Sequence, residues 1–460
     1  MAAIALVLIG VSAAFAQSGL SIHTAQPARF TIPPKVFSPI TMKTVPQATC
    51  VLHPTGVTDD EHRLRLFADD EGIVRFHLSP EAESEGAARF QIDCAAAGKI
   101  NIFPLQLRFS SSATADRPAA VAQVARTRPE AYVRPPLSED DALQLSTEEL
   151  EARGYPGKPD VQQTPEAFAT WLRSVTRPAT YVPSRVVANP HVIHDYRQGG
   201  GSGSGKSSNW SGYQLHAGFA AFYRVMGLWH VPQLSFESGY HTYSSVWVGI
   251  DGDSSSSGFR SSDLVQVGTE QDAADFYTTT GKCCPVALIH VQAVTDYAFT
   301  EAFDDFTSLP KGEQVIPNLS VNVGDSIFAE IIVGNPNVTL LIENLSRSAY
   351  TTVLLPIGRD IGSYTAEWIM ERPTVNGALP DLANYSLATL NSAFAWNPDR
   401  GWVSYGTDLS GWATAEQISM YNTVCSVGGI LSSFQCKANL LSSPRPLNGT
   451  DMQFVWSNFH

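Results

Sequence analysis

Hydrophobic and polar residues alternate with a period of two along much of this chain, and helical periodicity is rare. From residue 209 onward, short apolar or alternating runs follow one another at roughly ten-residue spacing, with turn residues between them. They read AFYRVMGLWHV, SVWVGI, LVQVG, ALIHVQAV, SIFAEIIV, VTLLIEN, TTVLLP, YTAEWIM and MQFVWSNF. Strands at this spacing predict an all-β domain, an antiparallel sandwich or barrel.

The first half of the chain has a different pattern. Residues 21–110 contain the alternating runs RLRLFAD, IVRFHLS and INIFPLQLRF, which predict a small β-sandwich. From 113 to about 205 the composition shifts to Pro, Arg, Ala and Glu. Two helices are predicted there, one over 146–153 with a capping box of Ser146 and Glu149, and one ending at Val175 with Thr164 as its N-cap and Pro165 at the first helical position. The rest predicts an extended connector that ends in a Gly/Ser linker at 199–205.

The first sixteen residues are apolar and end in Ala14-Phe15-Ala16, which matches a small-residue cleavage site. The run is too short to span a bilayer, so we expect a secretory signal peptide and a secreted protein. The predicted division is a signal peptide at 1–16, a small β-sandwich at 17–112, a Pro/Gly-rich connector and possible pro-region at 113–206, and the main domain at 207–460.

Negative charge is concentrated in the main domain. Residues 207–460 hold 10 of the 30 Lys and Arg but 23 of the 44 Asp and Glu, a net charge of −13 out of −14. Such a balance disfavours nucleic acid and anionic membranes as partners, and we expect neither. It is compatible with a domain that works at low pH, and we expect a monomer.

The chain has six cysteines but no C-x-x-C pair, which argues against a zinc ribbon or a thioredoxin motif. Export permits disulfides. We expect one local bridge between the first two cysteines and one between the last two, and the adjacent central pair has no predicted role. In order, the cysteines are Cys50, Cys94, Cys283, Cys284, Cys425 and Cys436.

Two motif matches lack the context that their function needs. Residues 200–207, GGSGSGKS, satisfy the P-loop pattern, but no buried strand precedes them and no helix follows them. Asp251-Gly-Asp253 resembles the start of a calcium loop, but Ser256 stands where the glycine should be and Ser262 where the closing Glu should be. We therefore expect no bound nucleotide, metal or other cofactor.

The sequence motifs of the common hydrolase mechanisms are missing, which leaves a carboxylate and an amide as the candidate catalytic groups. No G-x-S-x-G, H-E-x-x-H or D-[ST]-G occurs, and the histidines after residue 206 lack metal-ligand spacing. The run from Tyr364 to Glu371 fits a strand with Glu367 and Glu371 on one face, and it also fits a helix with the two glutamates one turn apart. Gly362 before it and Pro373 after it leave room for only a short element, which favours the strand. Both glutamates could instead be solvated positions on an open sheet face. Upstream, LVQVG at 264–268 places an amide at the centre of another short strand.

A set of six segments carries a family resemblance. In chain order they are SNWSG (208–212), GLWHVP (227–232), VWVGIDG (246–252), LVQVG (264–268), ENLS (343–346) and AEWIME (366–371). Together they resemble the eqolisin, or scytalidoglutamic, family of glutamic peptidases, and 383–396 resembles the family's late segment. The resemblance implies a concanavalin-like sandwich of two antiparallel sheets with the site on a concave face. It also implies an acid endopeptidase whose substrates are proteins or peptides.

Carried over position by position, the resemblance implies that Gln266 and Glu371 are catalytic. It implies supporting positions at Trp210, Trp247, Asp251 and Glu301. Where the family has W-Y-E-W-Y, residues 299–303 read FTEAF, so the aromatic walls are smaller and the subsite preference is expected to differ.

The chemistry agrees with this reading. Glu371, with an ordinary pKa near 4.3, can activate water and then protonate the leaving amine at about pH 3 to 5, where a histidine would already be protonated. The neutral Gln266 can donate its amide N–H to the oxyanion. Because an uninhibited peptidase endangers its producer, we expect a zymogen in which residues 17 to about 205 are removed near the linker. The alternatives are a carbohydrate-binding or glycosidase-like sandwich, an inactive binding protein, and a permanent N-terminal accessory domain.

Overall fold

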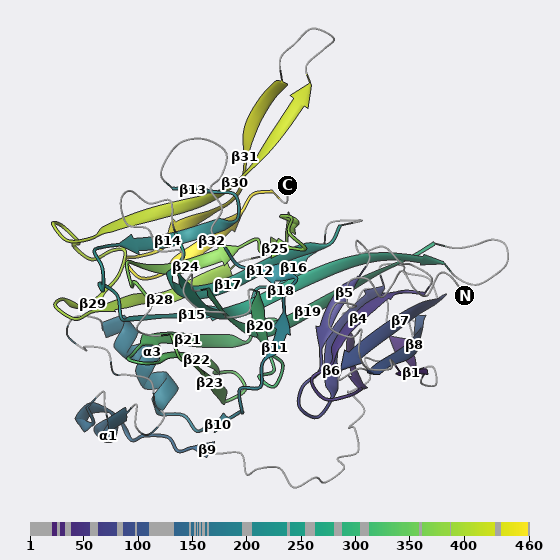
Figure 1. Ribbon diagram of the computed structural model, residues 1–460, viewed down its shortest axis with the longest axis horizontal. Coiled ribbons are helices and arrows are strands. Elements are labelled where there is room, and N and C mark those ends of the chain that lie inside the picture. The colour runs from purple at the N-terminus through teal and green to yellow at the C-terminus, as the bar shows by residue number, and fades with distance from the viewer. Residues whose placement is uncertain are drawn as a thin grey trace. The chain divides into compact units, whose positions relative to one another are not determined.

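The computed structural model describes residues 21–24, 28–32, 38–55, 63–80, 86–96, 99–109, 133–146, 149–150, 153, 155, 158, 162, 165–195, 205–236, 240–253, 263–279, 288–303, 312–357, 361–386, 388–427 and 434–458 (Figure 1). The signal peptide, most of the Gly/Ser linker and Cys283-Cys284 lie outside these residues. The chain forms two compact units. Unit 1 comprises residues 1–126, 236–242 and 272–295, and unit 2 comprises 127–235, 243–271 and 296–460.

Unit 1 is a small β-sandwich, and it includes two segments, 236–242 and 272–295, of the predicted main domain. One sheet has the order β1-β8-β7-β4-β5, with β2 also paired to β8, and a second set pairs β3 with β6 and β6 with the first half of β19. The strands are β1 (Ser21–Thr24), β2 (Ala28–Ile32), β3 (Ser38–Lys43), β4 (Thr49–Pro54), β5 (Leu64–Phe67), β6 (Ile73–Pro80), β7 (Gly86–Ala96) and β8 (Lys99–Phe109).

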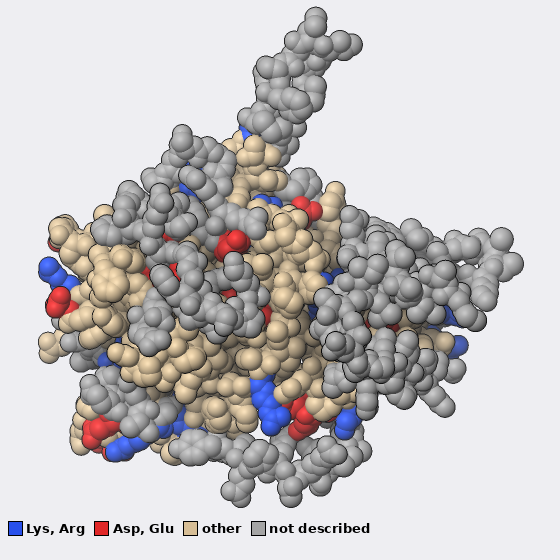
Figure 2. Space-filling view, in the orientation of Figure 1, with Lys and Arg blue, Asp and Glu red and all other residues tan. Residues whose placement is uncertain are grey.

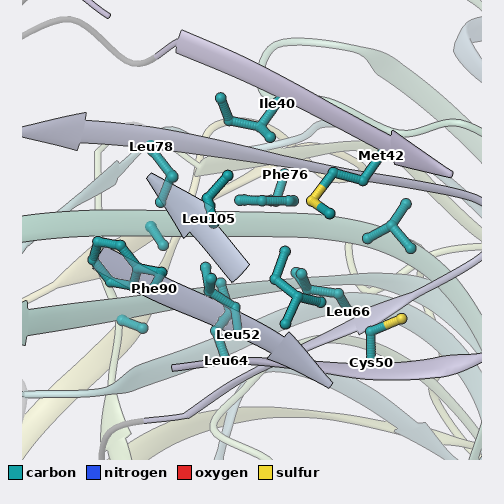
Figure 3. Close-up of a cluster of buried hydrophobic side chains, with 14 of the residues drawn as sticks. Ile40, Met42, Cys50, Leu52, Leu64, Leu66, Phe76, Leu78, Phe90 and Leu105 are labelled. Atoms are coloured by element: carbon teal, nitrogen blue, oxygen red, sulfur yellow. The ribbon is translucent and has the colours of Figure 1, made fainter. Parts of the chain in front are cut away.

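The core of unit 1 fills the space between these two layers. Ile40 and Phe76 come from β3 and β6, and Leu52, Phe90 and Leu105 come from the other sheet; all five are buried (Figure 3). The predicted disulfide between Cys50 and Cys94 is present, and it joins residues that face each other on β4 and β7.

Unit 2 holds most of the strands. They are β9 (Val133–Arg134), β10 (Ala179–Tyr181), β11 (Val187–Asn189), β12 (Val192–Ile193), β13 (Lys206–Ser207), β14 (Trp210–His216), β15 (Arg224–His230), β16 (Leu234–Ser235), β17 (Thr242–Asp251), β20 (Glu313–Ile316), β21 (Ser326–Val333), β22 (Val338–Asn344), β23 (Ala349–Leu355), β24 (Thr365–Glu371), β25 (Thr374–Val375), β26 (Asp381–Leu382), β27 (Asn384–Tyr385), β28 (Ala388–Asn397), β29 (Gly401–Val403), β30 (Thr414–Val427), β31 (Phe434–Pro446) and β32 (Met452–Trp456). Strands β18 (Leu264–Thr279) and β19 (Leu288–Phe303) belong partly to each unit.

The strands of unit 2 form two antiparallel sheets that share β30, which confirms the predicted sandwich. In the first sheet β14 lies between β24 and β30, and β24 pairs with β17 on its other side. In the second, β15 lies between β21 and β28, and the sheet continues through β22 and β23 on one side and through β32 and β31 to β30 on the other. The sheets face each other where Trp368 of β24 donates its indole N–H to the Met226 carbonyl of β15, at 2.8 Å.

Residues 133–195 of the predicted connector belong to unit 2 and carry structure of their own. The helix α3 (Pro165–Val175) begins at the predicted proline, and Ser146 and Glu149 form the predicted capping box. A further helix, α1 (Glu139–Gln144), was not predicted; Ser138 caps it by accepting the Asp141 backbone N–H. No helix in the described part of the chain has both the length and the apolar character needed to cross a membrane.

Much of the negative charge of residues 207–460 lies inside the protein. At least thirteen of the 23 Asp and Glu there are buried. On the face drawn in Figure 2, the exposed acidic side chains appear as separate red spots. The acidic composition therefore describes the interior as much as the surface.

Candidate active site

Strand β24 carries the two carboxylates that the sequence placed on one face. Glu371 faces Trp210 of β14 and Ser245 of β17, and Glu367 faces Gln214 of β14. All seven residues of β24 are buried. The alternative in which both glutamates are solvated on an open face is therefore wrong, because β14 and β17 flank the strand and further chain covers its face.

Three nitrogen atoms surround the Glu371 carboxylate. The Trp247 indole N–H donates to Oε2 at 2.8 Å, and the Asn209 amide donates to Oε1 at 2.9 Å. Nδ1 of His194 lies 3.0 Å from Oε2. Burial raises the pKa of Glu371, and the charge and hydrogen bond of His194 and the hydrogen bond of Trp247 oppose that rise. Trp210 packs edge-on against Trp247, with ring centroids 4.9 Å apart, and so fixes the indole that binds Glu371.

Gln266 reaches the same cluster from β18. A Cβ on Gly268, two residues further on the same strand, would lie 2.4 Å from the Val246 carbonyl, so only glycine lets β18 lie this close to β17. Gln266 Nε2 donates to Glu301 Oε2 and to the His194 carbonyl, at 3.0 Å each. The structure thus brings Gln266, Glu301 and Glu371 around a single residue, His194.

That residue was missed because it precedes the predicted domain boundary at 207. His194 is fully buried, and its ring stacks on Phe299 with centroids 4.2 Å apart and planes 9° from parallel. Its Nε2 lies 3.2 Å from Glu313 Oε2 and 3.9 Å from Glu270 Oε2. Burial alone lowers its pKa, but Glu371, Glu313 and Glu301 outweigh burial and raise the pKa to about 10, so the ring is an imidazolium.

The carboxylates around His194 are themselves held in place. Glu313 accepts from the Tyr297 hydroxyl at 2.8 Å and from the Asn189 amide at 2.6 Å. Burial raises the pKa of Glu301 to about 8, against the opposing charge of His194. The single positive charge of His194 cannot balance all of these buried carboxylates, so one of them favours the protonated form. The raised pKa of Glu301 makes Glu301 the carboxyl group that carries a proton near neutral pH.

A profile of the peptidase A4 family matches residues 208–437, which is half of the chain. The chain belongs to the peptidase A4 family. It is a glutamic endopeptidase, and the resemblance that its motifs carried is confirmed.

Two solved structures are similar over 54% of this chain and 98% of their own. Scytalido-glutamic peptidase with a peptide-based transition state analog is 19% identical, with a TM-score of 0.35. SCP-B, a member of the eqolisin family in a complex with the tripeptide Ala-Ile-His, is 18% identical, with a TM-score of 0.31. No curated protein sequence matches the chain.

Asp251, the fourth of the expected supporting positions, lies at the start of β24, away from the residues around Glu371. Its carboxylate accepts the backbone N–H groups of Ser363, Tyr364 and Thr365, at 2.7 to 3.1 Å, where the chain enters β24. Burial raises its pKa to about 6 despite these three donors. Asp251 therefore fixes the start of the strand that carries Glu371, and it has no described contact with Glu371.

Among the described residues, two groups of side chains have the spacing of metal ligands. One is His194, Glu270 and Glu313 in the site, and the other is His216, Asp253 and Glu416. In the second, His216 Nε2 lies 3.0 Å from Glu416 Oε2, and this hydrogen bond lowers the pKa of Glu416. Beyond Asp253, the residues of the suspected calcium loop lie outside the described part of the chain. Lys206 and Ser207, the last two residues of the P-loop match, form β13, and β14 follows where a P-loop needs a helix.

Proposed function

We propose that this endopeptidase cleaves peptide bonds with a dyad of Glu371 and Gln266. Glu371 takes a proton from the attacking water and then gives it to the leaving amine, while the Gln266 amide N–H binds the oxyanion. The Trp247 and Asn209 donors favour the carboxylate form of Glu371, which the base needs, and burial favours the acid form that the second step needs.

One contact above all supports this dyad. Gln266 Nε2 already donates a hydrogen bond to a peptide carbonyl, that of His194, and the same residue contacts Glu371. A donor that binds a peptide carbonyl beside a buried carboxylate is the geometry that water-mediated peptide hydrolysis needs.

Substitution of each dyad member tests the roles. We expect Glu371→Ala to abolish cleavage of a denatured protein near pH 3.5, and Gln266→Ala to leave a folded enzyme that is about 10²–10³-fold slower, because it loses one oxyanion donor. Glu367→Gln is the matched control: this carboxyl lies on the same face of β24, burial raises its pKa well above the usual range, and its rate should be unchanged. Equal residual activity in the two dyad variants would refute the division of roles.

We further propose that the enzyme is a secreted, monomeric zymogen, and that residues 17 to about 205 are a pro-region cleaved near the Gly/Ser linker in acid. Two cations of that region support this: Arg134 donates to the buried Glu343 at 2.7 Å, and His194 contacts Glu371. As the pH falls, the carboxylates become protonated and both attractions weaken. Mass spectrometry of acidified precursor is the test, and an intact, fully active chain would instead favour a permanent accessory region.

A further inference from the structure

Residues 187–195 cross the site as an extended segment whose backbone is paired at two places. Strand β11 runs antiparallel to β20, and β12 runs antiparallel to β25, which follows closely after Glu371. Gly312, at φ 105°, makes room for the segment, because a Cβ there would lie 2.8 Å from the Cα of Pro190. Extended peptide ligands commonly bind proteins by such strand addition. The segment therefore lies in the site in the manner of a bound peptide.

Side chains of the site bind the backbone of this segment at its centre. The His194 carbonyl accepts from Gln266 at 3.0 Å, and the His194 N–H donates to Glu301 Oε2 at 2.9 Å. The next carbonyl, that of Asp195, accepts from the Asn209 amide at 2.6 Å. The peptide bond between His194 and Asp195 is thus held from both sides, with its carbonyl on the proposed oxyanion donor.

The side chain of His194 fills a closed pocket that suits a cation. The ring of Phe299 forms one wall, and the carboxylates of Glu313, Glu270 and Glu371 surround the two ring nitrogens. An imidazolium donates charge-assisted hydrogen bonds through both nitrogens, and its flat face packs on an aromatic ring. A neutral apolar side chain would take away the positive charge and the ring hydrogen bonds that His194 brings to Glu313 and Glu371.

We propose that residues 192–195 occupy the substrate-binding groove as an internal substrate analogue, and that the pocket around His194 is a subsite for a cationic side chain, histidine above all, of the peptides that the enzyme cleaves. This rests on the proposed function and adds its substrate class. With the segment in place, His194 Nδ1 lies 3.0 Å from Glu371 Oε2 and the His194 carbonyl accepts the Gln266 amide, so the segment occupies both members of the dyad. The segment therefore inhibits the enzyme.

Full-length variants test whether residues 192–195 occupy the substrate-binding groove. We expect His194→Ala to raise the initial rate of peptide cleavage at pH 5 at least about 10-fold over the wild type, before any change in mass. His191→Ala is the matched control, since this histidine of the same segment meets Asn376 outside the pocket, and its rate should stay at the wild-type level. A His194→Ala chain that folds but is no more active than the wild type would overturn the occupancy.

Peptides added to the full-length His194→Ala variant test the subsite. Acetyl-Val-Ile-His-Asp-amide should inhibit about 10- to 100-fold more strongly at pH 5 than the same peptide with Leu in place of His, because hydrogen bonds to charged groups are lost. The peptide with Lys in place of His should inhibit more strongly than the Leu peptide and more weakly than the His peptide. In a variant that also carries Glu313→Gln, the difference in inhibition between the His and Leu peptides should be smaller. Equal inhibition by the His and Leu peptides would overturn the subsite while leaving the dyad intact.

Two further results separate the possible failures. If the double variant His194→Ala/Glu371→Ala remains active, the proposed dyad is wrong, whatever the peptides do. If His194→Ala does not fold, NMR titration of the wild-type histidines decides instead: His194 should stay protonated above pH 8 among its four carboxylate neighbours Glu270, Glu301, Glu313 and Glu371, whereas titration near pH 6.5 would place it outside the pocket.

Discussion

Replacing Arg134 by Met should destabilise unit 2 severely. Arg134 is fully buried, and its Nη2 donates to Glu343 Oε2 at 2.7 Å and to the Ser174 carbonyl at 2.9 Å. Its guanidinium also lies 4.4 Å from the centre of the Tyr350 ring. Met keeps the apolar stem but removes the charge, so Glu343, which is 1% exposed, loses its buried ion-pair partner.

Breaking one side of such a buried pair costs about 3–5 kcal/mol, a large share of the total stability of about 5–15 kcal/mol that is usual for a protein. The double variant Arg134→Met/Glu343→Gln should recover most of the lost stability, because neither position then carries a buried charge. Arg347→Met is the control. Its partner Asp325 lies at the same 2.7 Å, but Arg347 is 41% exposed, so we expect a loss of about 0–1 kcal/mol.

Urea unfolding followed by tryptophan fluorescence measures these differences, because all nine tryptophans lie in unit 2. Burial raises the pKa of Glu343 and Arg134 opposes the rise, so the Met variant raises that pKa further. A raised carboxyl pKa makes folding less favourable above the unfolded pKa and costs nothing below it. The loss should therefore shrink from pH 7 to pH 4. A loss at pH 7 no larger than that of Arg347→Met would refute the reasoning.

Two other substitutions test the site and unit 1. Trp247→Phe removes a hydrogen bond that stabilises the Glu371 carboxylate, so the pKa of Glu371 should rise and the acidic limb of the rate–pH profile should move to higher pH; an unchanged limb would contradict the contact. The double substitution Cys50→Ala/Cys94→Ala removes a disulfide between residues 44 apart, which should lower the free energy of unfolding by about 4 kcal/mol in the chain-entropy model. Residues 21–109 should then become sensitive to protease, and equal protease resistance of the variant and the wild type would contradict this prediction.

Local patterns in the sequence were enough to predict most elements of the described chain. The short run between Gly362 and Pro373 identified β24 as a strand, and alternation then placed Glu367 and Glu371 on one face, because side chains of a strand alternate whatever surrounds it. Capping and proline signals located α3 for the same reason, since they act within one turn of helix. The motifs also identified the peptidase family, which is carried by short segments in a fixed order.

The tertiary structure alone decided what surrounds the carboxylate. His194 lies 177 positions before Glu371, in a stretch whose composition predicts only a connector, and strand pairing with β20 and β25 brings it there. Sequence also did not foresee that β18 extends to Thr279, since its second half is held by the core of unit 1. Alternation and capping act over a few residues, so they are readable from the chain. Burial of the charges of Glu371, Glu301 and His194 depends on which distant segments meet, and no local pattern records that.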